Sequence, residues 1–320
     1  MASLYDLIVV GSGAAGLSAA LYAGRYNMKT LVIGKDFGGE TATAWIIENY
    51  PGFESIDGYD LMKNMEKQAK KLGTEIVHSE VQKLKNANGC FSAETKDGKQ
   101  FQTSALILAM GAQRRYLNLA REKEFTGKGV HYCVTCDGPL YQGKTVAMVG
   151  GGDSSVKGVN FLGEYAEKIY FIVMENKISA EPVNLERMKK LGSKVEVLLE
   201  TQVQELQGKE YLESLILSKA YNGKTELSVQ GVFIEIGFAP NTELPSQLGI
   251  ELDAKGYIKT NNMMETNVPG VFAAGDATNH FQGFKQVITA AALGSVAATS
   301  AYEYRKIHGD ICDLHARVAP

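Results

Sequence analysis

The feature that most constrains the fold is a glycine pattern, G-x-G-x-x-G, at residues 11–16. A short apolar run at residues 4–10 comes directly before it, and a helical pattern at residues 17–26 follows. In a strand–turn–helix unit the first glycine allows the tight turn, the second lets a pyrophosphate approach the backbone, and the third lets helix and strand pack closely. Because the helix N-terminus then faces the phosphate charge, the sequence predicts a dinucleotide-binding βαβ unit.

The next strand of this unit is expected at residues 30–33. An acidic side chain usually stands at the end of that strand and binds the ribose, but here the position is Gly34. Asp36 is the nearest following acid along the chain. The sequence therefore predicts a nucleotide site without identifying the group that holds its ribose.

A second unit of the same kind lies in the middle of the chain. Residues 145–149 are expected to form its strand and residues 150–155 its turn, with a helix after the turn. Gly150 and Gly152 match the pattern, while Ser155 stands where the third glycine is expected. Two such units predict an α/β chain with two Rossmann-like nucleotide-binding domains.

The segment after the next strand, expected at residues 169–173, bears on which nicotinamide nucleotide could bind. A 2′-phosphate would call for arginine here, but the first arginine is Arg187. Glu175 could instead accept hydrogen bonds from a free ribose 2′-hydroxyl and would repel a 2′-phosphate. The segment therefore favours NADH over NADPH, and a degenerate unit that binds no nicotinamide stays an alternative.

Between the two glycine patterns lies Cys133-Val134-Thr135-Cys136-Asp137, a C-x-x-C followed directly by an acid. Cysteines three apart lie one turn apart on a helix, about 5–6 Å between Cβ atoms, so a disulfide can close and open with little backbone motion. Asp137 could take or give the proton that a dithiol cycle must move. The motif therefore predicts that electrons pass from a nucleotide to sulfur.

Two other interpretations of the cysteines stay open. A C-x-x-C can be half of a zinc site, but a closed structural site needs four ligands. Cys90 and Cys312 are isolated along the chain, and His131 alone does not complete the set. The sequence therefore predicts no metal site. The remaining alternative is a pair of inert buried thiols.

The C-terminal third predicts a return to the first domain. Residues 232–237 read as the last strand of the second unit, and residues 270–276 as a strand that ends in Gly275 and Asp276. A carboxylate at that turn can bind a ribityl hydroxyl. The Ala-rich helix expected at residues 284–305 would favour negative charge at its N-terminus. The first domain is therefore expected to comprise residues 1–114 and 244–320, with residues 115–243 inserted.

Smaller elements complete the first segment. An amphipathic helix is expected at residues 61–72 and a buried strand at residues 105–112. Glycine and proline indicate loops at residues 38–41 and 48–52. A small antiparallel layer is expected from strands at residues 74–78, 90–95 and 100–103, with a hairpin turn at 96–99 and Cys90 as a structural thiol.

The charge and hydropathy of the chain argue against two classes of partner. A net charge of −3 without a basic block provides no electrostatic footprint for nucleic acid. No apolar run reaches membrane-spanning length, and no basic, apolar leader precedes the first strand. Four cysteines in 320 residues are not a secreted disulfide framework, and a lone C-x-x-C fits a reducing cytosol. A cytoplasmic protein is expected.

At this point the order of motifs resembles the low-molecular-weight thioredoxin reductase family over nearly the whole chain. The motifs stand at residues 11–16, 48–52, 133–138, 150–155 and 275–276, and the C-x-T-C-D-G between the two glycine patterns is the most selective. The resemblance implies an FAD domain and an inserted nicotinamide domain that rotate relative to each other, in a homodimer. It also implies that electrons pass from a reduced donor through FAD and Cys133–Cys136 to thioredoxin or a similar small dithiol protein.

The resemblance assigns roles to residues of this chain. Cys136 would be the sulfur on the flavin side, Cys133 would attack the thioredoxin disulfide, and Asp137 would donate the proton. The implied FAD-binding residues are Gly11, Ser12, Gly13, Ala14, Ala15, Gly16, Gly38, Gly39, Glu40, Thr41, Asn49, Val81, Gly111, Gly275, Asp276, Lys285, Gln286 and Val287. The nucleotide-binding residues of the second unit would be Gly150, Gly152, Asp153, Ser154 and Glu175. The chain would cross between domains near residues 114–117 and 240–245. The segment after His308, with Cys312 and His315, is expected to be disordered or to lie over the flavin.

Three departures from the family pattern bear on the donor and the flavin. The usual His-Arg-Arg and downstream Arg are absent around residues 173–180, Lys285 stands where arginine is usual, and Glu40 replaces a glutamine. Alternatives therefore stay open: a thioredoxin-reductase-like flavoprotein that uses ferredoxin or another non-nicotinamide donor, a flavin oxidase or ferredoxin-type reductase on the same fold, or a non-enzymatic redox-sensing protein.

Overall fold

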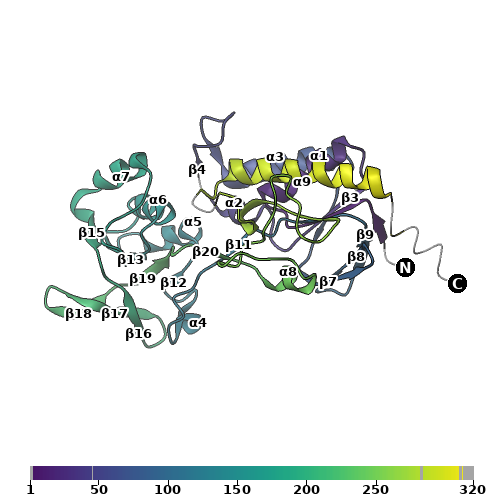
Figure 1. Cartoon of the computed structure of the whole chain (residues 1–320). Helices are drawn as coiled ribbons and strands as arrows, with labels where there is room; N and C mark the ends of the chain where they lie inside the picture. The colour runs from purple at the N-terminus through teal and green to yellow at the C-terminus, as the bar shows by residue number, and fades with distance from the viewer. Residues whose placement is uncertain (1–2, 45, 282–283, 310–311, 313–320) are drawn as a thin grey trace. The chain divides into compact units, whose positions relative to one another are not determined.

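The computed structural model describes residues 3–44, 46–281, 284–309 and 312. The chain forms two compact units, each built around a parallel sheet (Figure 1). The split unit comprises Met1–Gln113 and Ala239–Pro320, and the inserted unit comprises Arg114–Phe238. The two connections, β11 (Ala112–Arg114) and β20 (Phe238–Pro240), form a two-stranded sheet.

The split unit contains a five-stranded parallel sheet in the order β21-β10-β2-β3-β6. Its strands are β2 (Leu7–Val10), β3 (Thr30–Gly34), β6 (Glu75–His78), β10 (Leu106–Leu108) and β21 (Val271–Ala273). The first strand of this sheet, β2, lies in the middle, because successive crossovers place β3 and β6 on one side and β10 and β21 on the other. All residues of β2, β10 and β21 are buried, as is typical of parallel strands covered on both faces.

A second sheet of the split unit has the order β1-β9-β8-β7. Its strands are β1 (Ser3–Tyr5), β7 (Val81–Ala87), β8 (Cys90–Thr95) and β9 (Gln100–Thr103). The turn at residues 96–99 is confirmed, since Thr95 N donates to Lys99 O and Gly98 N donates to Thr95 O.

Two details of the expected strands are wrong. The single strand expected at residues 4–10 is interrupted at Asp6, whose carboxylate accepts a hydrogen bond from Lys29 N, so β1 joins a different sheet from β2. The strand expected at residues 74–78 pairs in parallel with β3 rather than in the antiparallel layer. The strand that replaces it there, β7, buries only Val81 and Leu84, so its apolar pattern is too sparse to read from sequence.

Helices cover one face of the split unit's parallel sheet, with α1 (Ala14–Arg25), α3 (Gly58–Lys71) and α9 (Val287–His308) grouped together (Figure 1). A Cβ on Gly294 would overlap the carbonyl oxygen of Ala15, so α1 and α9 meet at backbone contact. Small side chains such as Ala297, Ala298 and Ala301 fill the same core. The fingerprint turn is therefore held from its helical side by the C-terminal segment of the chain.

The inserted unit repeats this design. Its parallel sheet has the order β12-β19-β13-β14-β15, again with the strand of the glycine pattern in the middle. The strands are β12 (Val130–His131), β13 (Thr145–Val149), β14 (Lys168–Ile172), β15 (Val195–Leu198) and β19 (Gly231–Ile234). The antiparallel layer is β16 (Val203–Gly208), β17 (Leu212–Tyr221) and β18 (Lys224–Ser228). The predicted α/β class with two Rossmann-like domains is confirmed.

The remaining elements are short. In the inserted unit they are α4 (Glu122–Phe125), α5 (Val134–Asp137), α6 (Asp153–Leu162), α7 (Pro182–Lys189), η1 (Gly138–Tyr141) and η2 (Gly192–Lys194). In the split unit they are α2 (Gly39–Thr43), β4 (Ile46–Ile47), β5 (Ile56–Asp57), α8 (Glu243–Gln247) and η3 (Gly275–Ala277). The segment at residues 38–41, expected as a loop, thus begins a one-turn helix. Among the described residues, none of the helices combines the length and the hydrophobicity that crossing a bilayer requires.

The prediction that Cys90 is a lone structural thiol is wrong, because Cys90 forms a disulfide with Cys312. The two residues are 222 positions apart, so no spacing rule in the sequence could pair them. His315 lies outside the described residues, and the prediction for that part of the tail stays a prediction.

Candidate functional site

The fingerprint turn of the split unit has no room for side chains at two of its glycines. Gly11 has a φ of +115°, and a Cβ there would overlap Ala109 O. A Cβ on Gly16 would overlap Gly11 O. Gly13, by contrast, is the N-cap residue of α1, and no side chain caps the helix there. The first turn of α1 holds no acid, and the nearest atom to a Cβ on Gly13 would be Gly38 O at 3.8 Å. The N–H groups that begin α1 therefore fit an external anion such as the diphosphate of a dinucleotide.

The end of β3 explains why the usual acid is missing. A Cβ on Gly34 would overlap Ser12 Oγ, so no side chain can stand at that position. Ser12 Oγ donates a hydrogen bond of 2.9 Å to Asp36 O, which holds the turn after β3 against the fingerprint. Any ribose contact from this strand must therefore come from residues beyond Gly34.

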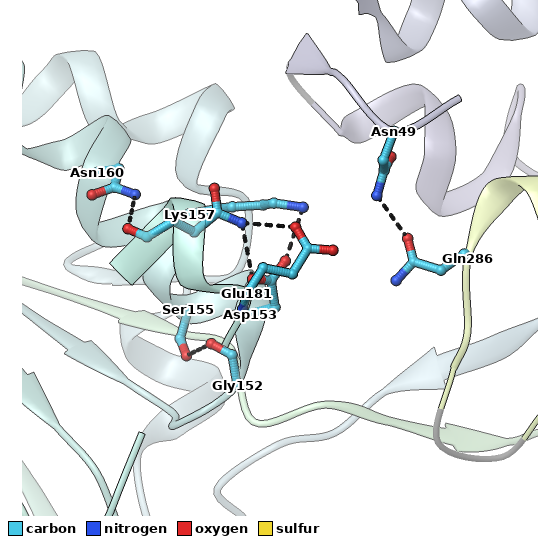
Figure 2. A network of polar contacts seen from close by, with 9 residues as sticks. Asn49, Gly152, Asp153, Ser155, Lys157, Asn160, Glu181 and Gln286 are labelled. Atoms are coloured by element: carbon cyan, nitrogen blue, oxygen red, sulfur yellow. Dashed lines mark hydrogen bonds and ion pairs between the residues drawn. The ribbon is translucent and has the colours of Figure 1, made fainter. Parts of the chain in front are cut away.

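Two residues from distant segments of the split unit meet beside the fingerprint helices. Asn49 Nδ2 donates a hydrogen bond of 3.1 Å to Gln286 Oε1, which joins the loop after β4 to the residue that caps α9 (Figure 2). Gly39, at the start of α2, has its hypothetical Cβ 3.5 Å from Gly13 Cα. Glu40 is exposed on α2, and Val81 is buried in the core below. The fold thus brings residues 39, 49 and 286 to the end of the unit where α1 begins.

Lys285 and Asp276 form the charged part of this end. Lys285 Nζ donates to three backbone carbonyls, Thr278 O at 2.8 Å, His280 O at 3.1 Å and Asp276 O at 3.4 Å. An ammonium group with three donors suits a cup of carbonyls better than the planar fork of arginine. Burial raises the pKa of Asp276, although the charge of Lys285 opposes the shift, and burial lowers the pKa of Lys285.

The glycine turn of the inserted unit tolerates the serine at its third position. A Cβ on Gly150, at a φ of +142°, would overlap Glu235 O. Ser155 is completely buried and its Oγ donates to Gly152 O at 2.7 Å, so its hydroxyl is satisfied inside the turn (Figure 2). No atom lies within 4 Å of a Cβ placed on Gly152. The turn therefore keeps the open backbone that a phosphate needs, despite the missing glycine.

Carboxylates gather around this second turn. Asp153, the first residue of α6, accepts hydrogen bonds from Glu181 N at 3.0 Å and Asn184 Nδ2 at 2.9 Å and pairs with Lys157 at 2.9 Å (Figure 2). Burial alone would raise the pKa of Asp153, but these partners outweigh it and the pKa is lowered. Glu175 Oε2 lies 3.0 Å from the position of a Cβ on Gly151, so its carboxylate rests against the turn.

The two cysteines of the C-x-x-C lie at one short helix, α5. Cys133 caps α5, and Cys136 lies in the turn, with Cα atoms 5.3 Å apart and a disulfide between the sulfurs. Cys136 N donates to Cys133 Sγ at 3.2 Å. Cys136 is exposed, whereas Cys133 is partly buried. The helical spacing inferred from C-x-x-C is confirmed in this geometry.

A histidine that the sequence suggested only as a zinc ligand is tied to Asp137 instead. His131 Nδ1 lies 2.8 Å from Asp137 Oδ2, and His131 Nε2 lies 2.6 Å from the Tyr141 hydroxyl. Because a carboxylate can only accept, Nδ1 carries the proton when Asp137 is ionised, and Nε2 then accepts from Tyr141. Burial, and secondarily the charge of Asp137, raises the pKa of Tyr141 to about 12. His131 itself is buried and stacks on Phe233.

The other flank of the cysteine pair is anchored as well. The buried Glu122 carboxylate accepts hydrogen bonds from Leu117 N at 3.0 Å, Leu119 N at 3.2 Å and the Tyr132 hydroxyl at 2.7 Å. Burial, reinforced by Glu122, raises the pKa of Tyr132. Residues on both sides of Cys133 are therefore held by side-chain hydrogen bonds, which leaves the C-x-x-C on a rigid support.

The sequence-predicted residues divide cleanly between the two units. All of those expected to bind FAD belong to the split unit, and the dithiol, Asp137 and the second glycine turn belong to the inserted unit. Within the inserted unit the second turn leads into α6, whereas the cysteine pair belongs to α5. Neither His131 nor Tyr141 was among the predicted site residues, because their spacing matches no known motif.

Comparisons with known proteins agree with this geometry. The model of the pyridine nucleotide-disulphide oxidoreductase family matches residues 5–294. A thioredoxin reductase of Treponema pallidum is 38% identical over 303 residues, covering 94% of this chain and 97% of the relative. The crystal structure of Lactococcus lactis thioredoxin reductase matches with a TM-score of 0.88 at 33% identity, covering 94% of this chain and 98% of that one. A ferredoxin-flavin thioredoxin reductase from Clostridium acetobutylicum matches with a TM-score of 0.51 at 32% identity, covering 96% and 99%.

The family of flavoproteins that this model describes uses FAD and a pyridine nucleotide to act on disulfides, and its match spans both units. The strand orders, the two glycine turns and the cysteine pair give that match a physical basis in this chain. The chain therefore belongs to the pyridine nucleotide-disulphide oxidoreductase family, and its fold is that of the low-molecular-weight thioredoxin reductases.

Proposed function

We propose that this protein is an FAD-dependent thioredoxin-disulfide reductase. Electrons pass from a reduced donor through FAD and the Cys133–Cys136 pair to thioredoxin or a similar small dithiol protein. The observation that carries the proposal is the closed cysteine pair on α5, followed directly by an acid that a buried histidine holds. Relatives named thioredoxin reductase that match over nearly the whole chain support it.

The dithiol reduces its partner by two exchange steps. The Cys133 thiolate attacks one sulfur of the partner disulfide, which forms a mixed disulfide and releases the partner's other sulfur as a thiolate. Cys136 then attacks Cys133 Sγ, so the Cys133–Cys136 disulfide forms again and the second partner sulfur leaves. Each leaving thiolate takes one proton, and Asp137 donates one of them. His131 keeps the resulting carboxylate in place through its Nδ1–H.

The split unit would hold FAD through the features described above. The N–H groups that begin α1 at Gly13 would bind the diphosphate, and Asp276 would bind a hydroxyl of the ribityl chain. Asn49, Gln286 and Lys285 would surround the flavin end of the molecule. Bound by these residues, FAD would supply the two-electron transfer between the donor and the Cys133–Cys136 disulfide.

NADH is the proposed donor. Gly150 and Gly152 leave the second turn open for a diphosphate, and Glu175 lies against Gly151 where it can accept from a free ribose 2′-hydroxyl. A 2′-phosphate at this place would meet the Glu175 carboxylate without an arginine in residues 173–180 to neutralise it. The same carboxylate therefore favours NADH and disfavours NADPH.

A reduced ferredoxin is the second candidate donor. The negative charges of Asp153 and Glu181 at the second turn oppose the charge of any dinucleotide diphosphate. A ferredoxin-flavin thioredoxin reductase is also among the structural neighbours at 32% identity. Stopped-flow reduction of the bound FAD by NADH, NADPH and reduced ferredoxin separates the candidates: only ferredoxin would reduce the flavin if the second turn no longer binds nucleotides.

The cysteine assignment is tested by Cys133→Ser and Cys136→Ser. Each variant should keep its bound flavin and its reduction by the donor, and should lose turnover with thioredoxin disulfide by at least about 100-fold. The control is Cys312→Ser, which should turn over like the unsubstituted protein. A Cys133→Ser variant with full thioredoxin turnover would refute the proposal, as would a purified protein without flavin. Reoxidation of the reduced flavin by oxygen but not by thioredoxin would identify a flavin oxidase instead.

We further propose that the protein works in the cytoplasm and as a homodimer. The cytosol keeps thiols reduced, and disulfides there are usually transient and catalytic, as the Cys133–Cys136 disulfide would be. The homodimer rests on the resemblance to the family alone, and sedimentation of the purified holoprotein tests it.

A further inference from the structure

A second disulfide lies outside the proposed electron path. Cys90 begins β8, and Cys312 lies four residues beyond the last residue of α9, so both belong to the split unit. Their Cα atoms are 4.9 Å apart, and the residues are only 8% and 5% exposed. Disulfides need a Cα separation of roughly 4.4–6.8 Å. Cys133 and Cys136 belong to the inserted unit and are fully paired with each other.

Contacts that involve no sulfur also bring the end of α9 to this sheet. A Cβ on Gly270 would lie 3.1 Å from ring atoms of both Phe91 and Tyr304, so these two rings approach each other across the glycine. Phe91 directly follows Cys90 and is almost completely buried. Arg305 forms an ion pair with Asp6, next to β1 of the same sheet. The last turns of α9 are therefore docked near β8 by aromatic packing and charge, which keeps Cys312 within reach of Cys90.

We propose that Cys90 and Cys312 are a second redox pair, a clasp that joins Cys312 to the start of β8 when it is closed. The proposal stands independently of the proposed function. Closing converts two thiols into a disulfide and releases two electrons and two protons to an oxidant, here a low-molecular-weight disulfide such as glutathione disulfide. One cysteine thiolate attacks that disulfide and releases one glutathione, and the other cysteine attacks the mixed disulfide and releases the second.

The clasp should matter for stability because it joins positions 222 residues apart. A cross-link over so long a loop strongly restricts the unfolded chain, which stabilises the folded state. In a reducing compartment, glutathione and other thiols reduce a disulfide whose reduction potential is high enough, by the reverse of the same exchange. The state of the clasp, and with it the stability of the split unit, therefore follows the balance of thiols and disulfides around the protein.

The test uses the full-length flavoprotein with Cys133→Ser and Cys136→Ser, which leaves Cys90 and Cys312 as the cysteines in the chain. This variant is equilibrated with glutathione and glutathione disulfide at several ratios, quenched in acid, alkylated and weighed by mass spectrometry. We expect two thiols to disappear together at one ratio, with the peptides of Cys90 and Cys312 linked and no glutathione retained. The closed form should melt at least about 3 °C higher than the open form.

A second measurement follows the described residues next to the clasp. Amide hydrogen exchange in the last turn of α9 and the start of β8 should be slower in the closed form than in the open form. Adding Cys312→Ser to the variant is the matched control: it should show no linked peptides, and its melting temperature should not depend on the glutathione ratio.

Three results would overturn the proposal. The first is two thiols that stay free at the most oxidising ratio, and the second is a separate glutathione adduct on each cysteine. The third is a linked pair whose closing changes neither melting temperature nor exchange.

In the chain that keeps Cys133 and Cys136, Cys90→Ser and Cys312→Ser should turn over thioredoxin within about twofold of the unsubstituted protein. A tenfold loss there would place the pair in the electron path and refute its independence.

Discussion

His131 Nδ1 lies 2.8 Å from Asp137 Oδ2, although His131 ends β12 and Asp137 ends α5, the helix that Cys133 caps. The imidazole is buried and its other nitrogen contacts the Tyr141 hydroxyl. The sheet of the inserted unit thereby fixes the orientation of the proposed acid, because a strand end and a helix end are joined by one ring. His131 is a positioning residue in this arrangement, since it acts on the partner disulfide only through Asp137.

His131→Leu should lower kcat for thioredoxin reduction by about tenfold or more, because Asp137 loses the donor that orients it. KM for thioredoxin should change much less, since His131 is buried and offers no surface to a partner. His131→Asn keeps an N–H donor at nearly the place of Nδ1 and should recover most of the rate. Steady-state kinetics of both variants with equal flavin content checks this, and equal losses in the two variants would contradict the positioning role.

Tyr141 should make the inserted unit lose stability at high pH. Its pKa is raised to about 12 in the folded chain from 10.0, chiefly by burial, so folding favours the neutral phenol. The stabilisation that this phenol provides is complete below pH 10, where it is neutral in both the folded and the unfolded chain. It is lost as pH rises toward 12, because the phenol ionises first in the unfolded chain. Between pH 9 and pH 11 this one group should remove about 1 kcal/mol of unfolding free energy.

The measurement is chemical denaturation of the unsubstituted protein and of Tyr141→Phe at pH 9 and at pH 11. Other buried tyrosines contribute to both proteins, so the informative quantity is the difference between them. The loss on raising the pH should be smaller in Tyr141→Phe by about 1 kcal/mol. Identical losses in the two proteins would show that the phenol of Tyr141 is not held neutral by the fold.

Glu175 should set the choice of nucleotide. Glu175→Arg replaces the carboxylate beside Gly151 with a group that can pair with a 2′-phosphate. The ratio of kcat/KM for NADPH to that for NADH should rise at least about tenfold, measured as stopped-flow reduction of the bound flavin. Glu164→Ala, an exposed carboxylate after α6, is the control and should leave the ratio unchanged. An unchanged ratio in Glu175→Arg would argue for a donor other than a nicotinamide nucleotide.

Gly34 should be intolerant of the side chain that other nucleotide-binding strands carry. A Cβ there would overlap Ser12 Oγ, and Ser12 has its own bond to Asp36 O. Gly34→Ala should cost about 1–3 kcal/mol of stability and lower the flavin content of the purified protein. Adding Ser12→Gly removes the overlapping hydroxyl and should restore part of both quantities. A double variant no better than Gly34→Ala would locate the defect elsewhere.

Much of the fold could be read from the sequence because its signals are local. The turns at residues 11–16 and 150–155 follow buried strands and precede helices, and a backbone-only phosphate site needs nothing more than that order. The C-x-x-C spacing likewise defines a helical pair by itself. The antiparallel layer was predicted less well. Most residues of β7 are exposed, and the sequence of β6 does not indicate which of the two sheets it joins.

The sequence by itself determined the two nucleotide-type units and the helical spacing of the C-x-x-C pair, because each depends on residues only a few positions apart. Only the tertiary structure decided which residues meet where no motif pairs them: His131 with Asp137 and Tyr141 across a strand end, Gly34 with Ser12, and Cys90 with Cys312. Such pairs depend on the register of strands and the docking of helices, which arise from packing the whole core rather than from any short stretch of the chain.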